Sequence, residues 1–153
     1  KQDQKLLAIW AAGCARRALR FFEKAHPKDN RPRKAIEECR EWAHTGVFRM
    51  ADIRSASLLA HAAAREAEEN SAARFAARAA GQAVATAHVP QHAFGAAYYA
   101  LKAVAADGPS KAGGRVAKEL GWQEGRIPKN LRHAWQDWQS RSLPKNLKLA
   151  IQN

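Results

Sequence analysis

The chain of 153 residues is 46% hydrophobic and carries a formal net charge of +12 at neutral pH. This length supports one domain with a hydrophobic core and is too short for two. Arginines interrupt the alanine-rich stretches, so no apolar run reaches the roughly 18 residues of a membrane-spanning helix, and we expect no membrane partner. The two cysteines both lie on apolar stripes, which excludes a disulfide scaffold and predicts buried thiols in the reducing cytoplasm.

Alanine, the strongest intrinsic helix former, supplies much of the apolar content, and alternating strand-like runs are missing, so the fold class predicted is all-α. The first helix is expected over residues 6–25. Its apolar stripe consists of Leu7, Trp10, Cys14, Ala18 and Phe21. After a turn, Pro32 suits the first position of a second helix that carries Cys39 on its apolar side and ends at Gly46.

Three further helices are expected over residues 50–69, 71–87 and 90–106. Asn70 or Ser71 can cap the second of these. The residue before a proline avoids helical geometry, so Val89–Pro90 predicts a break.

Each of these three helices has one narrow polar line on an alanine-rich surface, which predicts that they are the central helices of the bundle. Gly81 and Gly95 are expected where backbones approach closely. If the polar lines face one another, they form a groove; if they face outward, they form solvent-exposed or partner-binding surface. We favour the outward arrangement because arginines are rarely buried unpaired. The candidate partner-binding residues are His61, Arg65, Arg78, Gln82, His92 and Tyr99.

The C-terminal quarter holds a duplicated element, WQEGRIPKNLR from Trp122 and WQSRSLPKNLK from Trp138. Each copy predicts a helix end, a turn and a proline that starts the next helix. Residues 111–153 contain nine basic and three acidic residues, hence half of the net charge, and we expect them to pack on the same domain. Tryptophans there can stack on bases, but Trp135 and Trp138 share a face with Leu131, which favours a core stripe. The candidate residues for nucleic-acid binding, the alternative function, are Lys129, Arg132, Arg141, Lys145 and Lys148.

His88 and His92 have the spacing of two zinc ligands on one helix face. Pro90 interrupts that face and no nearby Cys, Asp or Glu completes a ligand set, so we interpret His88 as closing one helix and His92 as beginning the next. Gly113–Gly114 fits no phosphate-binding loop, and no nucleophile context occurs. We therefore predict no catalytic residues, no metal and no cofactor.

Three segments carry a family resemblance: DNRPRKAIEECREW (residues 29–42), AHAAAREA (60–67) and AARAAGQAVATAHVPQHAFGAAYYA (76–100). With them the chain resembles the bacterial immunity proteins, small helical proteins encoded near polymorphic toxins. The similarity extends from the first helix to the Trp138–Pro144 element. It implies an all-α domain without catalytic activity that binds a cognate toxin.

Taken together, we predict a single-domain bundle of about seven helices that antagonises a toxin by direct contact. Because the chain is strongly basic, its toxin partner is expected to be acidic at the contact surface. Nucleic acid should bind only weakly and without sequence preference. A nucleic-acid-associated protein that uses the basic C-terminal segment is the alternative.

Overall fold

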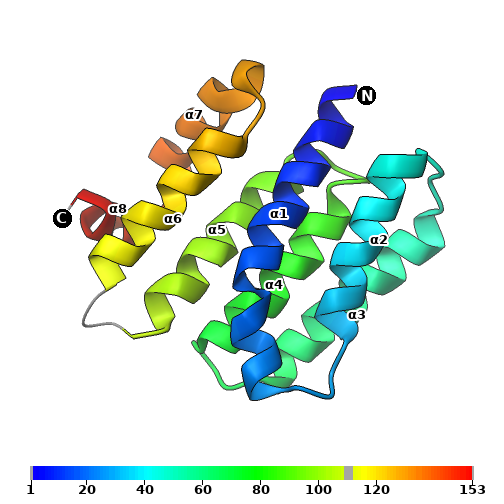
Figure 1. Cartoon of the computed structure of the whole chain (residues 1–153), viewed down its shortest axis with the longest axis horizontal. Coiled ribbons are helices and arrows are strands. Elements are labelled where there is room, and N and C mark those ends of the chain that lie inside the picture. Colours follow the sequence, from blue (N-terminus) through cyan, green and yellow to red (C-terminus); the bar gives the residue numbers. More distant parts are fainter. Residues whose placement is uncertain (1, 109–111, 153) are drawn as a thin grey trace.

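The computed structural model describes residues 2–108 and 112–152, and the secondary-structure elements of these residues are all helices (Figure 1). The all-α prediction is confirmed: the described residues form eight α-helices and one short 3-10 helix, where about seven helices were expected. In chain order they are α1 (Gln2–Ala25), α2 (Arg31–Thr45), α3 (Met50–Glu66), α4 (Ala72–Ala85), α5 (His92–Ala106), α6 (Ala112–Arg126), η2 (Lys129–Leu131), α7 (Arg132–Ser142) and α8 (Lys145–Gln152).

The first five helices form two layers. Helices α1 and α2 lie side by side in front, and α3, α4 and α5 lie behind them (Figure 1). Helix α4 is the centre of the bundle because it contacts α1, α2, α3 and α5. Helix α6 extends along the far side of α5, and α8 packs against α6 (Figure 1). Within the described part of the chain, no helix is both long and apolar enough to cross a bilayer.

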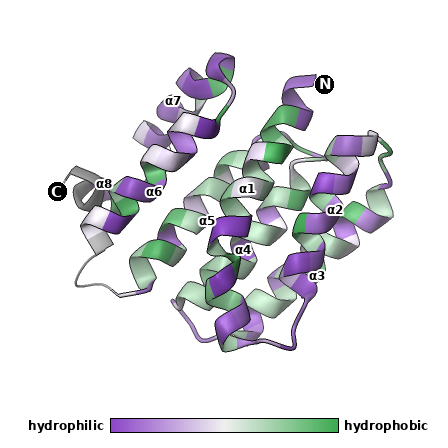
Figure 2. Cartoon of the chain, viewed as in Figure 1, coloured by the Kyte–Doolittle hydropathy of each residue, from purple (hydrophilic) through white to green (hydrophobic). Residues whose placement is uncertain are grey.

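Small side chains explain the central position of α4. Its buried residues are alanines, one valine and Gly81, which let four neighbouring helices approach closely. Helix α5 is likewise predominantly hydrophobic, whereas α2 and α7 carry mostly hydrophilic residues (Figure 2). Helix α3 is more peripheral than the sequence suggested. It buries only four residues and leaves Leu58 and Leu59 exposed, because it packs mainly against α2 and α4.

Local signals place several helix ends. Gly46 ends α2 with a positive φ of 74°, and its N–H donates to Trp42 O at 2.7 Å. The Ser71 hydroxyl accepts from the Arg74 backbone N–H at 3.1 Å and so caps α4. The break at Val89–Pro90 is confirmed, since α4 ends at Ala85 and α5 begins at His92.

Two helix ends differ from expectation. Helix α3 ends at Glu66, three residues early, because Ala67 already has extended backbone geometry. After α4, the carbonyls of Thr86 and Ala87 accept from Gln4 Nε2 at 3.0 and 3.1 Å. The side chain that bonds these terminal carbonyls therefore comes from α1, and it is not His88, which is exposed.

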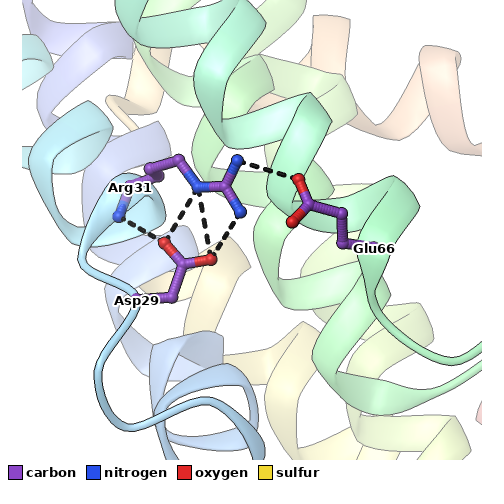
Figure 3. A network of polar contacts seen from close by, with 3 residues as sticks. All are labelled: Asp29, Arg31 and Glu66. Atoms are coloured by element: carbon purple, nitrogen blue, oxygen red, sulfur yellow. Dashed lines mark hydrogen bonds and ion pairs between the residues drawn. The ribbon is translucent and has the colours of Figure 1, made fainter.

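The turn between α1 and α2 is fixed by an arginine that joins two carboxylates (Figure 3). Arg31 donates to Asp29 at 2.7 Å and to Glu66, at the end of α3, at 2.9 Å. The hydrogen bonds from Arg31 lower the pKa of both carboxyl groups. The network thus ties the beginning of α2 to the end of α3.

Aromatic packing attaches the C-terminal helices to the bundle. Trp135 is fully buried, and its ring centroid lies 5.4 Å from that of Trp10, 5.6 Å from Phe94 and 5.5 Å from Trp138. Trp10 Nε1 also donates to the backbone carbonyl of Gln123 at 2.9 Å. The core-stripe interpretation of Trp135 and Trp138 is therefore confirmed. Both copies of the duplicated element have the expected form, with a helix end, a proline and a new helical turn.

An ion pair and a pair of thiols complete the core. Arg17 of α1 donates to the buried carboxylate of Glu119 on α6 at 2.7 and 3.0 Å. Cys14 and Cys39 are buried, free thiols, as predicted. The Cys39 thiol lies 3.2 Å from Ala83 O, and burial raises its pKa to about 12. These cysteines are therefore packing residues with little thiolate character.

Candidate partner-binding face

Helix α4 exposes only one stripe, because its other sides face α1, α2, α3 and α5. Arg74, Arg78 and Gln82 form this stripe and are half-buried. Polar and charged residues of α3 and α5 flank it. We call this surface, on the side of the back layer that faces away from α1 and α2, the α3–α5 face. It comprises Arg54, His61, Arg65, Arg74, Arg78, Gln82, His92, Tyr99 and Lys102.

The first polar pair on this face joins α3 to α4. Arg78 Nη1 lies 2.9 Å from His61 Nδ1. A guanidinium only donates hydrogen bonds, so His61 Nδ1 accepts and the imidazole is neutral. Burial, followed by the charges of Arg78 and Arg65, lowers the pKa of His61 to about 4. The ring lies directly over Gly81, where a Cβ atom would stand 2.6 Å from Nε2.

The second pair repeats this arrangement between α4 and α5. His92 Nδ1 lies 2.7 Å from Gln82 Oε1, which fixes Nδ1 as the donor. Burial, followed by the charge of His88, lowers the pKa of His92. The amide group of Gln82 lies over Gly95, where a Cβ atom would stand 2.7 Å from Oε1. Each of the two interhelical hydrogen-bonded pairs thus has one side chain lying directly over a glycine, His61 over Gly81 and Gln82 over Gly95.

Gly81 and Gly95 do lie at close approaches, as expected, but what approaches them is a side chain. The His61 ring occupies the space above Gly81, and the Gln82 amide occupies the space above Gly95. The hydroxyl of Ser57 adds a bond to Gly81 O at 3.1 Å. The absent side chains make room for polar groups of the neighbouring helix rather than for its backbone.

The structure therefore brings four of the six predicted residues together. The polar lines meet one another in pairs, as in the groove considered from the sequence, yet each pair remains half open to the surface. Arg65 is exposed one helical turn from His61. Tyr99 lies apart in an aromatic cluster, with ring centroids 6.4 Å from Phe75 and 5.0 Å from Tyr98.

Sequence reasoning missed this aromatic cluster. The Lys102 ammonium lies over the rings of Phe75, Tyr98 and Tyr99, at 4.5, 5.3 and 5.9 Å from their centroids. Such contacts stabilise a cation by about 0.5–1 kcal/mol at partly exposed sites. The sequence separation between Phe75 and the tyrosines of α5 does not predict this contact, because the cluster forms only when α4 and α5 pack together.

The charged side chains that define the α3–α5 face are all cationic, four arginines and one lysine. Among the described residues, Arg54, Arg65, Arg78 and Lys102 form no ion pair. The ion pairs present lie elsewhere, for example between Arg17 and Glu119 across α1 and α6. This face therefore has a positive potential that is open to an anionic partner.

The basic residues of the C-terminal segment are distributed differently. Arg141 pairs with Asp137 at 2.9 Å, and Lys148 donates to Ser140 O at 2.7 Å. Lys129 and Lys145 are exposed, and Arg132 is half-buried. Trp135 is fully buried and so is not presented for stacking on bases, whereas Trp138 is partly buried and packs against the core.

His88 and His92 have different surroundings. His88 is exposed in the turn after α4, and the His92 ring bonds Gln82. Residues 2–108 and 112–152 contain no group of three His, Cys, Asp or Glu side chains that could hold a metal ion.

The fold and this face define a small all-α protein whose most distinctive surface is cationic and built from interhelical polar pairs. The chain matches the family model described as "Imm-5 like putative immunity protein" over residues 1–130, and it belongs to that family. The match covers α1 to α6 and ends before α7, so the second copy of the duplicated element lies beyond it, although the resemblance seen in the sequence extends to Pro144. No curated protein and no solved structure shows significant similarity to the chain.

Proposed function

We propose that this protein is an immunity protein that antagonises a cognate bacterial toxin by direct, non-enzymatic contact. Membership of the immunity protein family is the observation that carries the proposal. The architecture is compatible with it, since packed helices hold the polar side chains of the α3–α5 face in place. Catalysis is not needed for such a role, because occupying the toxin is sufficient.

The α3–α5 face is the contact surface in this proposal. Its cations Arg54, Arg65, Arg78 and Lys102 lack ion-pair partners among the described residues, so a partner can neutralise them without breaking existing pairs. An acidic surface on the toxin would supply complementary charge, which mainly accelerates association and selects the partner. The toxin is therefore expected to be acidic where it meets this face.

Co-expression with the toxin domain encoded by the adjacent gene tests the proposal. The protein should restore growth, and the two purified chains should form a stable complex. Titration of the toxin's activity separates contact from catalysis. A contact antagonist abolishes the activity only at about one equivalent, whereas full protection at a small fraction of an equivalent indicates an enzyme. Absence of both complex and protection would refute the proposed function.

A further inference from the structure

The hydrogen bonds within the two polar pairs of the α3–α5 face leave some side-chain donors without a partner among the described residues. In the first pair His61 provides the acceptor, Nδ1, for one N–H of Arg78. In the second pair Gln82 provides its only side-chain acceptor, Oε1, to His92. The internal bonds therefore use acceptors, and the side-chain groups of Arg78 and Gln82 left without a partner among the described residues are donors.

These remaining donors are specific atoms. The Arg78 guanidinium has five N–H groups, and its only bond among the described residues is the one from Nη1 to His61. The Gln82 amide nitrogen has no partner among those residues. Because Arg78 and Gln82 are four residues apart on α4, they project from the same side, about 5–6 Å apart at their Cβ atoms. Both are half-buried, so their directions are restricted by the neighbouring helices.

The charges around these donors identify the kind of acceptor. Arg54 and Arg65 on α3 are exposed and take part in no ion pair within the described part of the chain. A neutral acceptor would leave this positive charge uncompensated, whereas a carboxylate would neutralise it. An arginine fork matches the two oxygens of a carboxylate, and a remaining lone pair of that carboxylate can accept from a primary amide.

We infer that Arg78 and Gln82 together bind one carboxylate of an acidic segment of the partner protein, while His61 and His92 act as positioning residues that orient them. The inference rests on the proposed function and adds its central contact. Gly81 and Gly95 are needed for the same contact. A side chain at Gly81 would displace the His61 ring, which orients Arg78, and a side chain at Gly95 would displace the amide of Gln82. Arg54 and Arg65 steer the acidic segment toward this contact.

The test uses the full chain and the catalytically inactivated toxin domain encoded by the adjacent gene, with Kd measured by calorimetry at about 150 mM salt. Arg78→Ala should weaken binding about 30-fold, as expected for a central arginine hot spot. Gln82→Ala should weaken it about fivefold. Arg40→Ala is the matched control, because it removes the same charge from an exposed position on α2, in the other layer, and should change Kd less than twofold.

The positioning role has its own test. His61→Leu should weaken binding about tenfold in the wild-type chain and have almost no effect in the Arg78→Ala background, since it acts through Arg78. His61→Gln, which restores an acceptor, should recover most of the affinity. The thermal midpoint of each variant shows whether it is folded, and Arg78→Lys, which keeps the charge and loses the fork, replaces Arg78→Ala if the latter does not fold.

The outcomes separate the two proposals. If the wild-type chain does not bind the toxin domain, the proposed function fails, and this inference fails with it. If the wild-type chain binds while Arg78→Ala (or Arg78→Lys in its place) and Gln82→Ala behave like Arg40→Ala, the inference is wrong and the proposed function stands. Nanomolar binding of labelled DNA or RNA that depends on Arg78 would also overturn it, in favour of phosphate recognition.

Discussion

Replacing Gly81 by alanine should destabilise the protein, which is the reverse of what this change normally does inside a helix. Alanine is favoured over glycine there by about 1 kcal/mol. In this structure, however, the new Cβ atom would stand 2.6, 2.8 and 2.9 Å from three atoms of the His61 ring. Contacts below 3.0 Å require the ring to move, and the ring is held by Arg78.

The net effect can be worked from these terms. Overpacking a close contact costs about 1–3 kcal/mol, and weakening the bond between Arg78 and His61 adds about 1 kcal/mol. Subtracting the gain in helix propensity, about 1 kcal/mol, leaves a net loss of about 1–3 kcal/mol. For a chain of this length about 1 kcal/mol corresponds to roughly 3 °C, so the midpoint should fall by roughly 3–9 °C.

Thermal unfolding followed by circular dichroism measures this shift, with Gly121→Ala as the matched control. Gly121 lies in α6 and is exposed, and a Cβ atom added there would meet no other atom within 4 Å. Alanine at that position should therefore raise the midpoint by up to about 3 °C. In a His61→Ala background, Gly81→Ala should also become stabilising. A Gly81→Ala variant that is as stabilising as Gly121→Ala in the wild-type chain would refute the reasoning.

Three further predictions address the ion pair, the pH dependence and nucleic acid. Arg17→Ala should cost about 2 kcal/mol in urea unfolding because it leaves the Glu119 carboxylate, which is only 7% exposed, without its cation; a loss below about 0.5 kcal/mol would contradict this. The pKa of His61 is lowered to about 4 in the folded protein, whereas it is about 6.5 in the unfolded chain. The stability that the neutral ring contributes is therefore complete above about pH 6.5 and is lost as the pH falls from there toward 4. The free energy of unfolding should drop by on the order of 1 kcal/mol between about pH 7 and 5.5, a figure already reduced for solvent screening of a half-buried ring. His61→Gln should abolish this pH-dependent loss. Labelled DNA and RNA should bind no tighter than micromolar at about 150 mM salt; nanomolar binding that disappears when the basic residues of the C-terminal segment are neutralised would favour the nucleic-acid alternative.

The sequence by itself determined the fold class and several helix boundaries. Gly46, Ser71 and Val89–Pro90 act through backbone geometry and hydrogen bonds within a few residues, so their effects can be read without knowledge of the rest of the chain. The periodicity of apolar residues likewise identified Cys14 and Trp135 as core residues, since burial on a helix follows from a 3.6-residue repeat. The candidate residues of the α3–α5 face were found in the same way, as polar lines on otherwise apolar helices.

Only the tertiary structure decided which of these residues meet. The bond between His61 and Arg78 depends on the rotation and separation of α3 and α4, which are fixed by alanine packing along the whole contact. The same holds for the Gln4 side chain, which bonds Thr86 O from 82 residues away in the chain. Such contacts join residues distant in sequence, and their geometry follows from the summed packing of many weakly specific small side chains. The relative placement of the helices cannot be read from any local sequence pattern. The polar lines were therefore predictable from the sequence, and their pairing over the glycines was not.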